Sequence, residues 1–281
     1  MSFVYNVQDI YPDIAIRLGI LRNKRLIDVF RFLEHFVYSK ATALSVISDG
    51  FKANLLSKGV PDKKVHVIPN FADTDFIRPL PRHNRFSKAQ GLDDHFVVLF
   101  AGNLGLSQGL ELVLEAAGLL KDFPEICFLM VGNGAAKMAL LDLVQRMNLK
   151  NVNFLAFLPY QDIPEMYASS DVCLVPLKRG ITKESVPSKV YSILAAGRPI
   201  IASVDEGSDT WRLIREAGCG ICIPPEDPHA LAGAVIRSYR KREDGICMGE
   251  KGRTYVEAHF SRQQVAKKYE QLFMHVVDRG K

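Results

Sequence analysis

Residues 95–134, HFVVLFAGNLGLSQGLELVLEAAGLLKDFPEICFLMVGNG, decide the fold. Two apolar runs, His95–Ala101 and Ile126–Gly132, have the length and composition of buried strands. Between them, over residues 108–121, apolar residues recur with a spacing near 3.6, which is typical of a helix. A strand, a helix and a second strand in this order form a βαβ unit, whose strands lie parallel. The stretch therefore predicts a parallel sheet covered by helices.

The same alternation continues toward the C-terminus. It predicts four further strands, at Val152–Phe154, Val172–Pro176, Pro199–Ser203 and Gly220–Ile223. It also predicts helices at about residues 135–147, 162–168, 187–196, 208–217 and 228–241, the second of them with a capping-box pattern at Asp162 and Glu165. Six strands with intervening helices are enough for one complete Rossmann-like, doubly wound α/β domain, which we place at residues 94–260.

The chain before this domain is also of α/β type but shorter. Strands are predicted at Phe3–Val7, Leu44–Ile47 and Val65–Ile68. Because a βα unit takes about 30 residues, residues 1–78 hold only two or three units and form a partial domain. Residues 79–93 are rich in Pro, Asn, Asp and Arg and are expected to be a linker. Residues 261–281 are expected to form a C-terminal helix.

Composition excludes several classes of protein. Of the 281 residues 48% are hydrophobic and 24% charged, which is typical of a soluble globular protein. No run approaches the ~20 apolar residues of a membrane span, and Asp9 and Asp13 fall where a signal peptide has its apolar core. The cysteines lie mostly in apolar stretches, so we expect reduced thiols and a cytoplasmic location. Because Cys219 and Cys222 occur in a predicted strand, we expect no metal site there.

Positive charge is concentrated at the N-terminus. Residues 1–90 carry 14 Lys/Arg and 8 Asp/Glu, a net charge of +6, whereas residues 91–281 have a net charge of −1. Within residues 17–40 basic side chains surround an apolar helical pattern, which favours either contact with an anionic membrane surface or a core helix with solvated basic ends. Nucleic-acid binding is not expected, because no stacking aromatics accompany the basic residues in a known module.

Two glycine-containing loops follow the first two strands of the larger domain. Ligands of open α/β sheets bind beyond the carboxyl ends of the strands. The first loop is either a phosphate-binding cradle or an ordinary βα turn, and its candidate residues are Gly102, Asn103, Gly105, Gln108 and Gly109. The second loop either leaves room for a nucleotide base or sugar or needs glycine only for a positive φ, and its residues are Gly132, Asn133 and Gly134.

A third stretch, ESVPSKVYSILAAGRP at residues 184–199, places polar groups at the start of a helix. The carboxylate of Glu184 can accept hydrogen bonds from sugar hydroxyls, while Ser188, Lys189 and the helix N-terminus offer donors and positive charge to a diphosphate. The arrangement suits a sugar nucleotide. An alternative is purely structural, with Glu184 complementing the helix dipole and Lys189 solvated.

Six segments of the chain, taken in order, resemble family-4 retaining glycosyltransferases of the colanic-acid, capsule and O-antigen branch, which have the GT-B fold of two Rossmann-like domains. These segments are VHVIPNFADTDFIRP (65–79), VVLFAGNLGLSQGLELVLEAA (97–117), FLMVGNGAAKMAL (128–140), NVNFLAFLPYQDIPEMYASSDVCLVPL (151–177), ESVPSKVYSILAAGRPIIAS (184–203) and FSRQQVAKKYEQLF (260–273). The resemblance implies metal-independent transfer of a sugar, with retention, from a nucleoside-diphosphate donor to a polysaccharide or lipid-linked acceptor. It implies no cofactor.

The resemblance also implies roles for single residues. Glu184 matches the first acid of the family's E-x7-E pattern and would contact the donor sugar, while Ser192 stands at the second acid. Lys189, Ser188 and the Gly102–Gly109 loop would hold the diphosphate. The base-side loops match Gly132–Gly134 and the turn formed by Phe157, Leu158 and Pro159. The D-x-D of Asp73–Asp75 lies in the match to the interdomain connection, so a turn is expected there.

The resemblance predicts that only the later part of the N-terminal, acceptor-side domain is present, since the match begins near YNVQDIYPDIAIRLG (5–19). The helix at 261–281 would return to that domain. Two alternatives to a transferase remain. One is a non-catalytic or split subunit that binds a sugar nucleotide and needs a separate N-terminal domain subunit, and the other is a GT-B-type sugar-nucleotide epimerase. A lipid-linked acceptor would place the protein at the inner face of the cell membrane.

Overall fold

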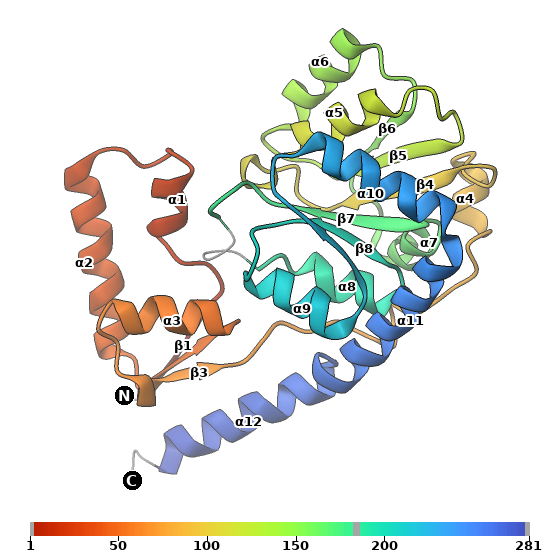
Figure 1. Ribbon diagram of the computed structural model, residues 1–281. Coiled ribbons are helices and arrows are strands. Elements are labelled where there is room, and N and C mark those ends of the chain that lie inside the picture. The colour runs from red at the N-terminus through yellow and green to blue at the C-terminus, as the bar shows by residue number, and fades with distance from the viewer. Residues whose placement is uncertain (1–2, 182–185, 279–281) are drawn as a thin grey trace.

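The computed structural model, which describes residues 3–181 and 186–278, contains two parallel sheets (Figure 1). The larger sheet has the order β6-β5-β4-β7-β8-β9, so successive strands are added first on one side of β4 and then, from β7 on, on the other. All six strands predicted for this domain are confirmed to within one residue. They are β4 (Phe96–Ala101), β5 (Ile126–Val131), β6 (Val152–Leu155), β7 (Val172–Pro176), β8 (Ile200–Ser203) and β9 (Gly220–Ile223).

Helices cover both faces of this sheet, as the doubly wound prediction requires (Figure 1). Alternate residues of β4 point into separate cores: Val97 and Leu99 into one, Val98 and Phe100 into the other. One core is closed by α5 (Glu111–Leu119), α6 (Lys137–Met147) and α10 (Pro228–Arg240), and the other by α7 (Ile163–Ala168), α8 (Lys189–Ala195), α9 (Asp209–Ala217) and α11 (Arg242–His259).

Helix α11 was not predicted, because glycines take the place of an apolar stripe. A Cβ atom on Gly249 would lie 2.1 Å from the carbonyl oxygen of Gly197, and one on Gly252 would lie 2.7 Å from the Leu194 side chain. The absence of side chains therefore lets α11 lie directly against α8 and the turn that follows it. A helix that packs through glycines lacks the apolar periodicity by which amphipathic helices are found.

The smaller sheet has the order β1-β2-β3 and is also parallel. Its strands are β1 (Val4–Val7), β2 (Ala43–Val46) and β3 (Val65–Val67), which confirms the three strands expected there. Leu44, Val46, Phe51 and Leu55 form the centre of its core. The helices of this part are α1 (Asp13–Arg17), α2 (Lys24–Lys40) and α3 (Asp49–Ser57), and the single turn η1 (Asp62–Lys64) precedes β3.

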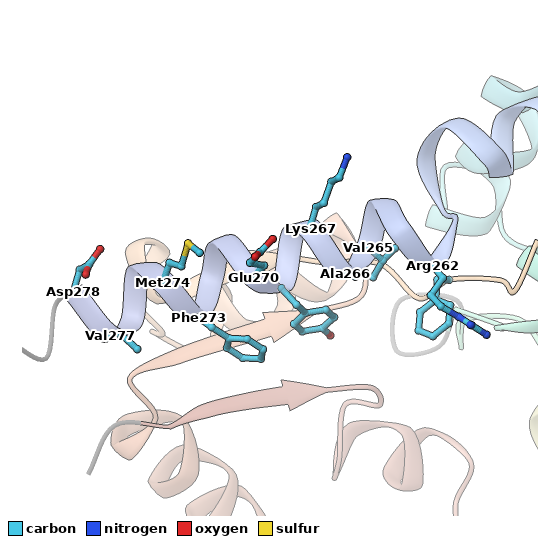
Figure 2. Close-up of a pocket in the computed structure, with 11 residues that line it drawn as sticks. Arg262, Val265, Ala266, Lys267, Glu270, Phe273, Met274, Val277 and Asp278 are labelled. Carbon is cyan, nitrogen blue, oxygen red and sulfur yellow. The ribbon is translucent and has the colours of Figure 1, made fainter.

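The C-terminal helix α12 (Arg262–Asp278) runs back along the smaller sheet (Figures 1 and 2). Its residues Val265, Leu272 and Val276 pack with Ala43 and Ile68 of the sheet region. A neighbouring apolar stripe stays about half exposed and lines a groove of about 1,000 Å³, shown in Figure 2; it comprises Phe71, Phe273, Met274 and Val277.

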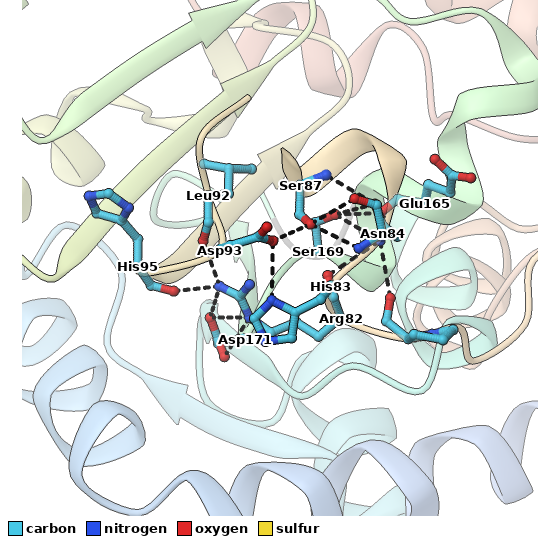
Figure 3. Close-up of polar contacts among 11 residues, drawn as sticks. Arg82, His83, Asn84, Ser87, Leu92, Asp93, His95, Glu165, Ser169 and Asp171 are labelled. Carbon is cyan, nitrogen blue, oxygen red and sulfur yellow. Dashed lines mark hydrogen bonds and ion pairs between the residues drawn. The ribbon is translucent and has the colours of Figure 1, made fainter. Parts of the chain in front are cut away.

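The segment predicted as a linker is tied to the larger domain by a polar cluster around Arg82 (Figure 3). The guanidinium pairs with Asp171 at 3.0 Å and donates to the carbonyl oxygens of Leu92 and His95. Asp171 also accepts a hydrogen bond of 2.7 Å from the backbone N–H of Val97, at the centre of the sheet. The segment also contains the helix α4 (Arg85–Ala89).

The capping box expected at Asp162 and Glu165 was wrong. The side chain of Asp162 caps nothing in α7. Instead, both carboxylates pair with Arg85 of α4, at 2.6 Å and 3.4 Å. The two acids therefore fasten α4 to α7, a long-range role that the local sequence pattern does not distinguish from capping.

Replacing Arg82 with alanine should lower the free energy of unfolding by about 3 kcal/mol, because it leaves the largely buried Asp171 carboxylate unpaired. Urea denaturation followed by circular dichroism measures this change. Arg78→Ala removes an exposed arginine of the same segment and should change stability by no more than about 0.5 kcal/mol. Equal effects of the two substitutions would contradict a clamping role for Arg82.

Candidate active site

A cavity of about 470 Å³ lies at the carboxyl ends of the central strands of the larger sheet. It is next to the boundary between β4 and β7, where the order of strands reverses and ligands of doubly wound sheets bind. The structure brings eight of the predicted site residues together in its wall: Gly102, Asn103, Gln108, Phe157, Leu158, Ser188, Lys189 and Ser192.

The loops after β4 and β5 interlock beside this cavity. The N–H of Leu104 donates to the carbonyl of Asn133 at 2.8 Å. A Cβ atom on Gly132 would lie 1.9 Å from the carbonyl oxygen of Gly102, and one on Gly134 would lie 2.5 Å from that of Leu104. These glycines thus let two backbone segments meet. Gly132, Asn133 and Gly134 do not line the cavity, which differs from the expected role of making room for a base or sugar.

The first loop does not open directly into a helix. It passes through the single turn η2 (Leu106–Gln108) and Gly109, which has a φ of +58°, before α5 begins at Glu111. The N–H of Gly102 is already bonded to the carbonyl of Val131 at the end of β5, and the N–H of Leu104 to the carbonyl of Asn133 in the loop after β5. The expectation that the amides of the whole loop bind phosphate is therefore wrong for these two. Asn103 and Gln108 reach the cavity, whereas Gly105 and Gly109 do not line it.

Lys189, the first residue of α8, places its amine inside the cavity. Its Nζ donates to Oε1 of Gln108 at 2.9 Å and lies 3.7 Å from the centroid of the Phe100 ring. Burial lowers the pKa of Lys189 to about 7. Within residues 3–181 and 186–278 no carboxylate pairs with this amine. A bound anion would supply the missing negative charge and favour the protonated form.

Hydroxyl groups of α7 and α8 complete this side of the cavity. Ser188 immediately precedes α8, and Ser192 lies one turn further along. The Tyr167 hydroxyl lies near the side chain of Ser192, and burial raises the pKa of Tyr167 well above its usual value. Tyr167 was not predicted as a site residue, because its neighbours Met166 and Ala168 read as a buried helix.

The smaller domain contributes Asp9, which follows β1 and lines the same cavity. Partial burial raises the pKa of its carboxyl group. Asp9 was also not predicted, because the loop after the first strand contains no glycine, which was the signal used for the loops of the larger domain. At the rim, Phe157 is exposed and Leu158 half-buried; Pro159 precedes the turn η3 (Tyr160–Asp162) and does not line the cavity.

Other predicted residues lie elsewhere. Glu184 falls outside the described residues. Asp73 accepts a hydrogen bond from the N–H of Phe76 and pairs with Arg262, so the D-x-D forms a turn. Burial raises the pKa of the thiols of Cys219 and Cys222, consistent with the predicted apolar strand. Among the described residues no cluster of three or more His, Cys, Asp or Glu side chains could hold a metal ion.

The cavity thus combines an amine, hydroxyls, side-chain amides and an apolar rim. Lys189 and Ser188 can bind a phosphate group, because cationic and hydroxyl donors meet near a helix N-terminus. Phe157 offers a flat apolar face to an aromatic ring. Asp9, which the smaller domain contributes, can accept hydrogen bonds from hydroxyl groups. Such a set of groups fits a ligand that has a phosphate, a ring and several hydroxyls.

Sequence relatives cover most of this chain. WbjE of Pseudomonas aeruginosa, a probable glycosyltransferase, is 32% identical over 83% of the chain and 59% of its own length. WcaI of Escherichia coli K12, a putative colanic acid biosynthesis glycosyl transferase, is 28% identical over 83% of the chain and 58% of its own length. The chain thus spans about three fifths of the length of these two relatives.

Solved structures share the fold over almost the whole chain. HepE of Anabaena, in complex with UDP and glucose, has a TM-score of 0.81 at 17% identity, covering 99% of this chain and 72% of its own. Sucrose-phosphate synthase of Thermosynechococcus elongatus has a TM-score of 0.80 at 20% identity, covering 99% and 69%. The family model described as glycosyl transferases group 1 matches residues 83–255. The chain belongs to the group 1 glycosyl transferase family.

Proposed function

We propose that the chain is a glycosyltransferase, or the donor-binding part of one, that moves a sugar with retention from a nucleoside diphosphate to a carbohydrate or lipid-linked acceptor. The observation that carries the proposal is the buried amine of Lys189 beside Gln108, at the carboxyl edge of a sheet with the order of a nucleotide-binding domain. Membership of a glycosyl transferase family and the UDP bound by HepE support it.

In this proposal Lys189 and Ser188 hold the diphosphate, which is also the leaving group. Charge develops on that group as the bond to the sugar breaks, and a fixed cation in a partly dry site stabilises it. This role for Lys189 makes a metal unnecessary. Phe157 and Leu158 contact the base, and Asp9 faces the sugar. The resemblance assigns Glu184 to the donor sugar as well, although it lies outside the described residues.

Calorimetric titration with UDP, GDP and dTDP, and with their sugar derivatives, tests the proposal. We expect saturable binding of one base in preference to the others, and Asp9→Asn should weaken binding of the matching sugar nucleotide more than that of the free diphosphate. If none of the six ligands binds, the proposed donor site is wrong. If all bind equally well to a variant lacking Lys189, the assignment of the site is wrong.

A second candidate function is a subunit that binds a sugar nucleotide and requires a partner polypeptide for transfer. It is favoured by the half-exposed apolar stripe on α12, at Phe273, Met274 and Val277, which adjoins the smaller sheet (Figure 2). Transfer to an acceptor by the chain alone would exclude it. If the nucleoside diphosphate is released only when an acceptor is present, the less favoured alternative, a sugar-nucleotide epimerase, is excluded.

Helix α2 is proposed to contact an anionic membrane surface. The alternative, a helix buried in the core, was wrong, because Tyr38 is the only buried residue of α2. Arg25 and Lys40 lie along its exposed apolar face and suit anionic lipid. Within residues 3–181 and 186–278, no helix combines the length and apolarity needed to cross a membrane. The exposed apolar residues are Leu26, Val29, Phe30, Phe32, Leu33 and Phe36.

Replacing Phe32, which is 68% exposed, with serine should lower the affinity for anionic vesicles at low salt by about tenfold, because one large side chain no longer enters the interface. Co-sedimentation with vesicles of phosphatidylglycerol measures the effect. Met138→Ser removes a side chain that is 69% exposed on α6 and should have no effect. The proposal would be contradicted if Phe32→Ser bound the vesicles as tightly as the wild type, or if the wild-type protein did not co-sediment with them.

A further inference from the structure

A second cavity, of about 580 Å³, lies at the opposite edge of the larger sheet from the candidate active site. Its walls come from the start of β4 at Phe96, the Gly197–Pro199 turn after α8, the linker at Pro79 and α11 from Arg242 to Thr254. These segments meet at the amino ends of the strands. The cavity is therefore separate from the donor site, with the length of α8 between the two.

Positive charge dominates this second cavity. Four arginines line it (Arg82, Arg198, Arg242 and Arg253), against two acids, Asp171 and Glu250. Two of the arginines already have carboxylate partners: Arg82 pairs with Asp171, and Arg253 pairs with Glu257 and donates to the carbonyls of Thr74 and Ile77. The guanidinium groups of Arg198 and Arg242 form no ion pair among the described residues, and with Glu250 as the other acid of the wall the cavity keeps a net positive charge.

One buried N–H donor of Arg198 has no hydrogen-bond acceptor among the described residues. Its Nη2 donates to the carbonyl of Leu80 at 3.0 Å, while its Nε is buried and has no hydrogen-bond partner among the described residues. Nη1 of the neighbouring Arg82 is buried and unpartnered in the same way. Buried donors of charged groups are costly when unsatisfied.

Arg242 is held by aromatic rings in place of an acid. Its guanidinium carbon lies 5.3 Å from the centroid of Phe96 and 5.4 Å from that of Tyr239. No ion pair forms at Arg242 within the part of the chain that the structure describes. A cation–π contact uses none of the guanidinium N–H donors, so they remain available to phosphate oxygens.

We propose that this second cavity binds the phosphate monoester of an organic molecule, with Arg198 and Arg242 on the phosphate and apolar walls at Phe96, Ile246 and Pro79 around the organic part. A phosphate dianion balances the two guanidinium charges. A fully polar ligand such as inorganic phosphate leaves the apolar walls unused and should bind more weakly. The site is independent of the proposed donor site.

Titration with phenyl phosphate and with inorganic phosphate tests this proposal. Phenyl phosphate should bind more tightly than inorganic phosphate, and Arg198→Gln and Arg242→Gln should each weaken it by about tenfold. Arg240→Gln, an exposed arginine of α10 outside the cavity, and a Lys189 variant should bind phenyl phosphate as the wild type does. Because Arg242 is exposed, its replacement leaves the fold intact, and circular dichroism checks this for both variants.

Binding that is lost with Lys189 but unchanged in both arginine variants would overturn the proposal, since the ester would then occupy the donor site. So would equal affinities of the wild type and Arg242→Gln. Vesicles containing phosphatidic acid distinguish the source of the ester. Vesicle binding that falls in Arg242→Gln assigns a lipid headgroup, and vesicle binding that is unchanged while phenyl phosphate binding falls assigns a soluble monoester.

Discussion

Replacing Lys189 with methionine is expected to weaken the binding of UDP by about a hundredfold at pH 7, because a diphosphate held in a largely desolvated site loses its paired cation. Methionine keeps the length and apolar contacts of the side chain, so the Phe100 ring stays covered. Isothermal titration calorimetry measures the affinity. Lys150→Met removes an equal charge from an exposed position and should leave the affinity unchanged.

The same residue should make UDP binding depend on pH. The pKa of Lys189 in the free protein is about 7, and a bound diphosphate raises it, because binding favours the charged amine. Above pH 7 the free protein must first take up a proton to bind, so affinity falls as pH rises. We expect a fall of about tenfold between pH 7 and pH 8.5 in the wild type.

In Lys189→Met this fall should be absent, which separates the effect of the amine from ionisation of the nucleotide. An affinity of the wild type that is constant over this range would contradict a neutral, buried amine in the free protein. An equal fall in the wild type and in the variant would assign the pH dependence to another group. The assignment of Lys189 to the diphosphate site itself is tested by the affinity lost in Lys189→Met.

Gly132→Ala is expected to lower the free energy of unfolding by about 4 kcal/mol, through backbone strain and a clash that no rotamer relieves. The added Cβ would lie 1.9 Å from the Gly102 carbonyl oxygen, and the φ of Gly132 is +147°. Relief requires the loops after β4 and β5 to move apart. UDP binding should therefore fall as well, even in the fraction that folds. Urea denaturation and calorimetry measure the two effects.

Gly233→Ala is the matched control. Gly233 lies within α10 and a Cβ there meets nothing within 4 Å, so alanine should stabilise the protein by about 0.5–1 kcal/mol. Opposite signs for the two substitutions would support the tight approach of the loops. A Gly132→Ala protein as stable as the wild type would show that the two loops are not fixed against each other.

Most of the fold was predictable, because its strands are covered on both faces. The runs at β4 and β5 are apolar throughout, and this composition distinguishes them from the helices around them. Helix α11 was missed since Gly249 and Gly252 form its contact with α8. The true start of α5 was missed because it depends on the left-handed conformation of Gly109.

The candidate site was predictable where its residues follow a strand or begin a helix. Gly102, Asn103 and Lys189 were found in this way and line one cavity. Asp9 and Tyr167 were missed. Asp9 comes from the other domain, and the local sequence does not show that the two domains face each other there. Tyr167 lies in an apolar segment, which is typical of a core helix and not of a cavity wall.

A crystal structure of the complex with UDP tests the central claim most directly. The account predicts the diphosphate in the cavity at the carboxyl ends of β4 and β7, with Nζ of Lys189 at about 2.7–3.2 Å from a phosphate oxygen and the uracil ring near Phe157. Gln108 would then no longer be the principal partner of the amine. A nucleotide bound in the arginine-lined cavity at the opposite edge of the sheet, with Lys189 still bonded to Gln108, would contradict it.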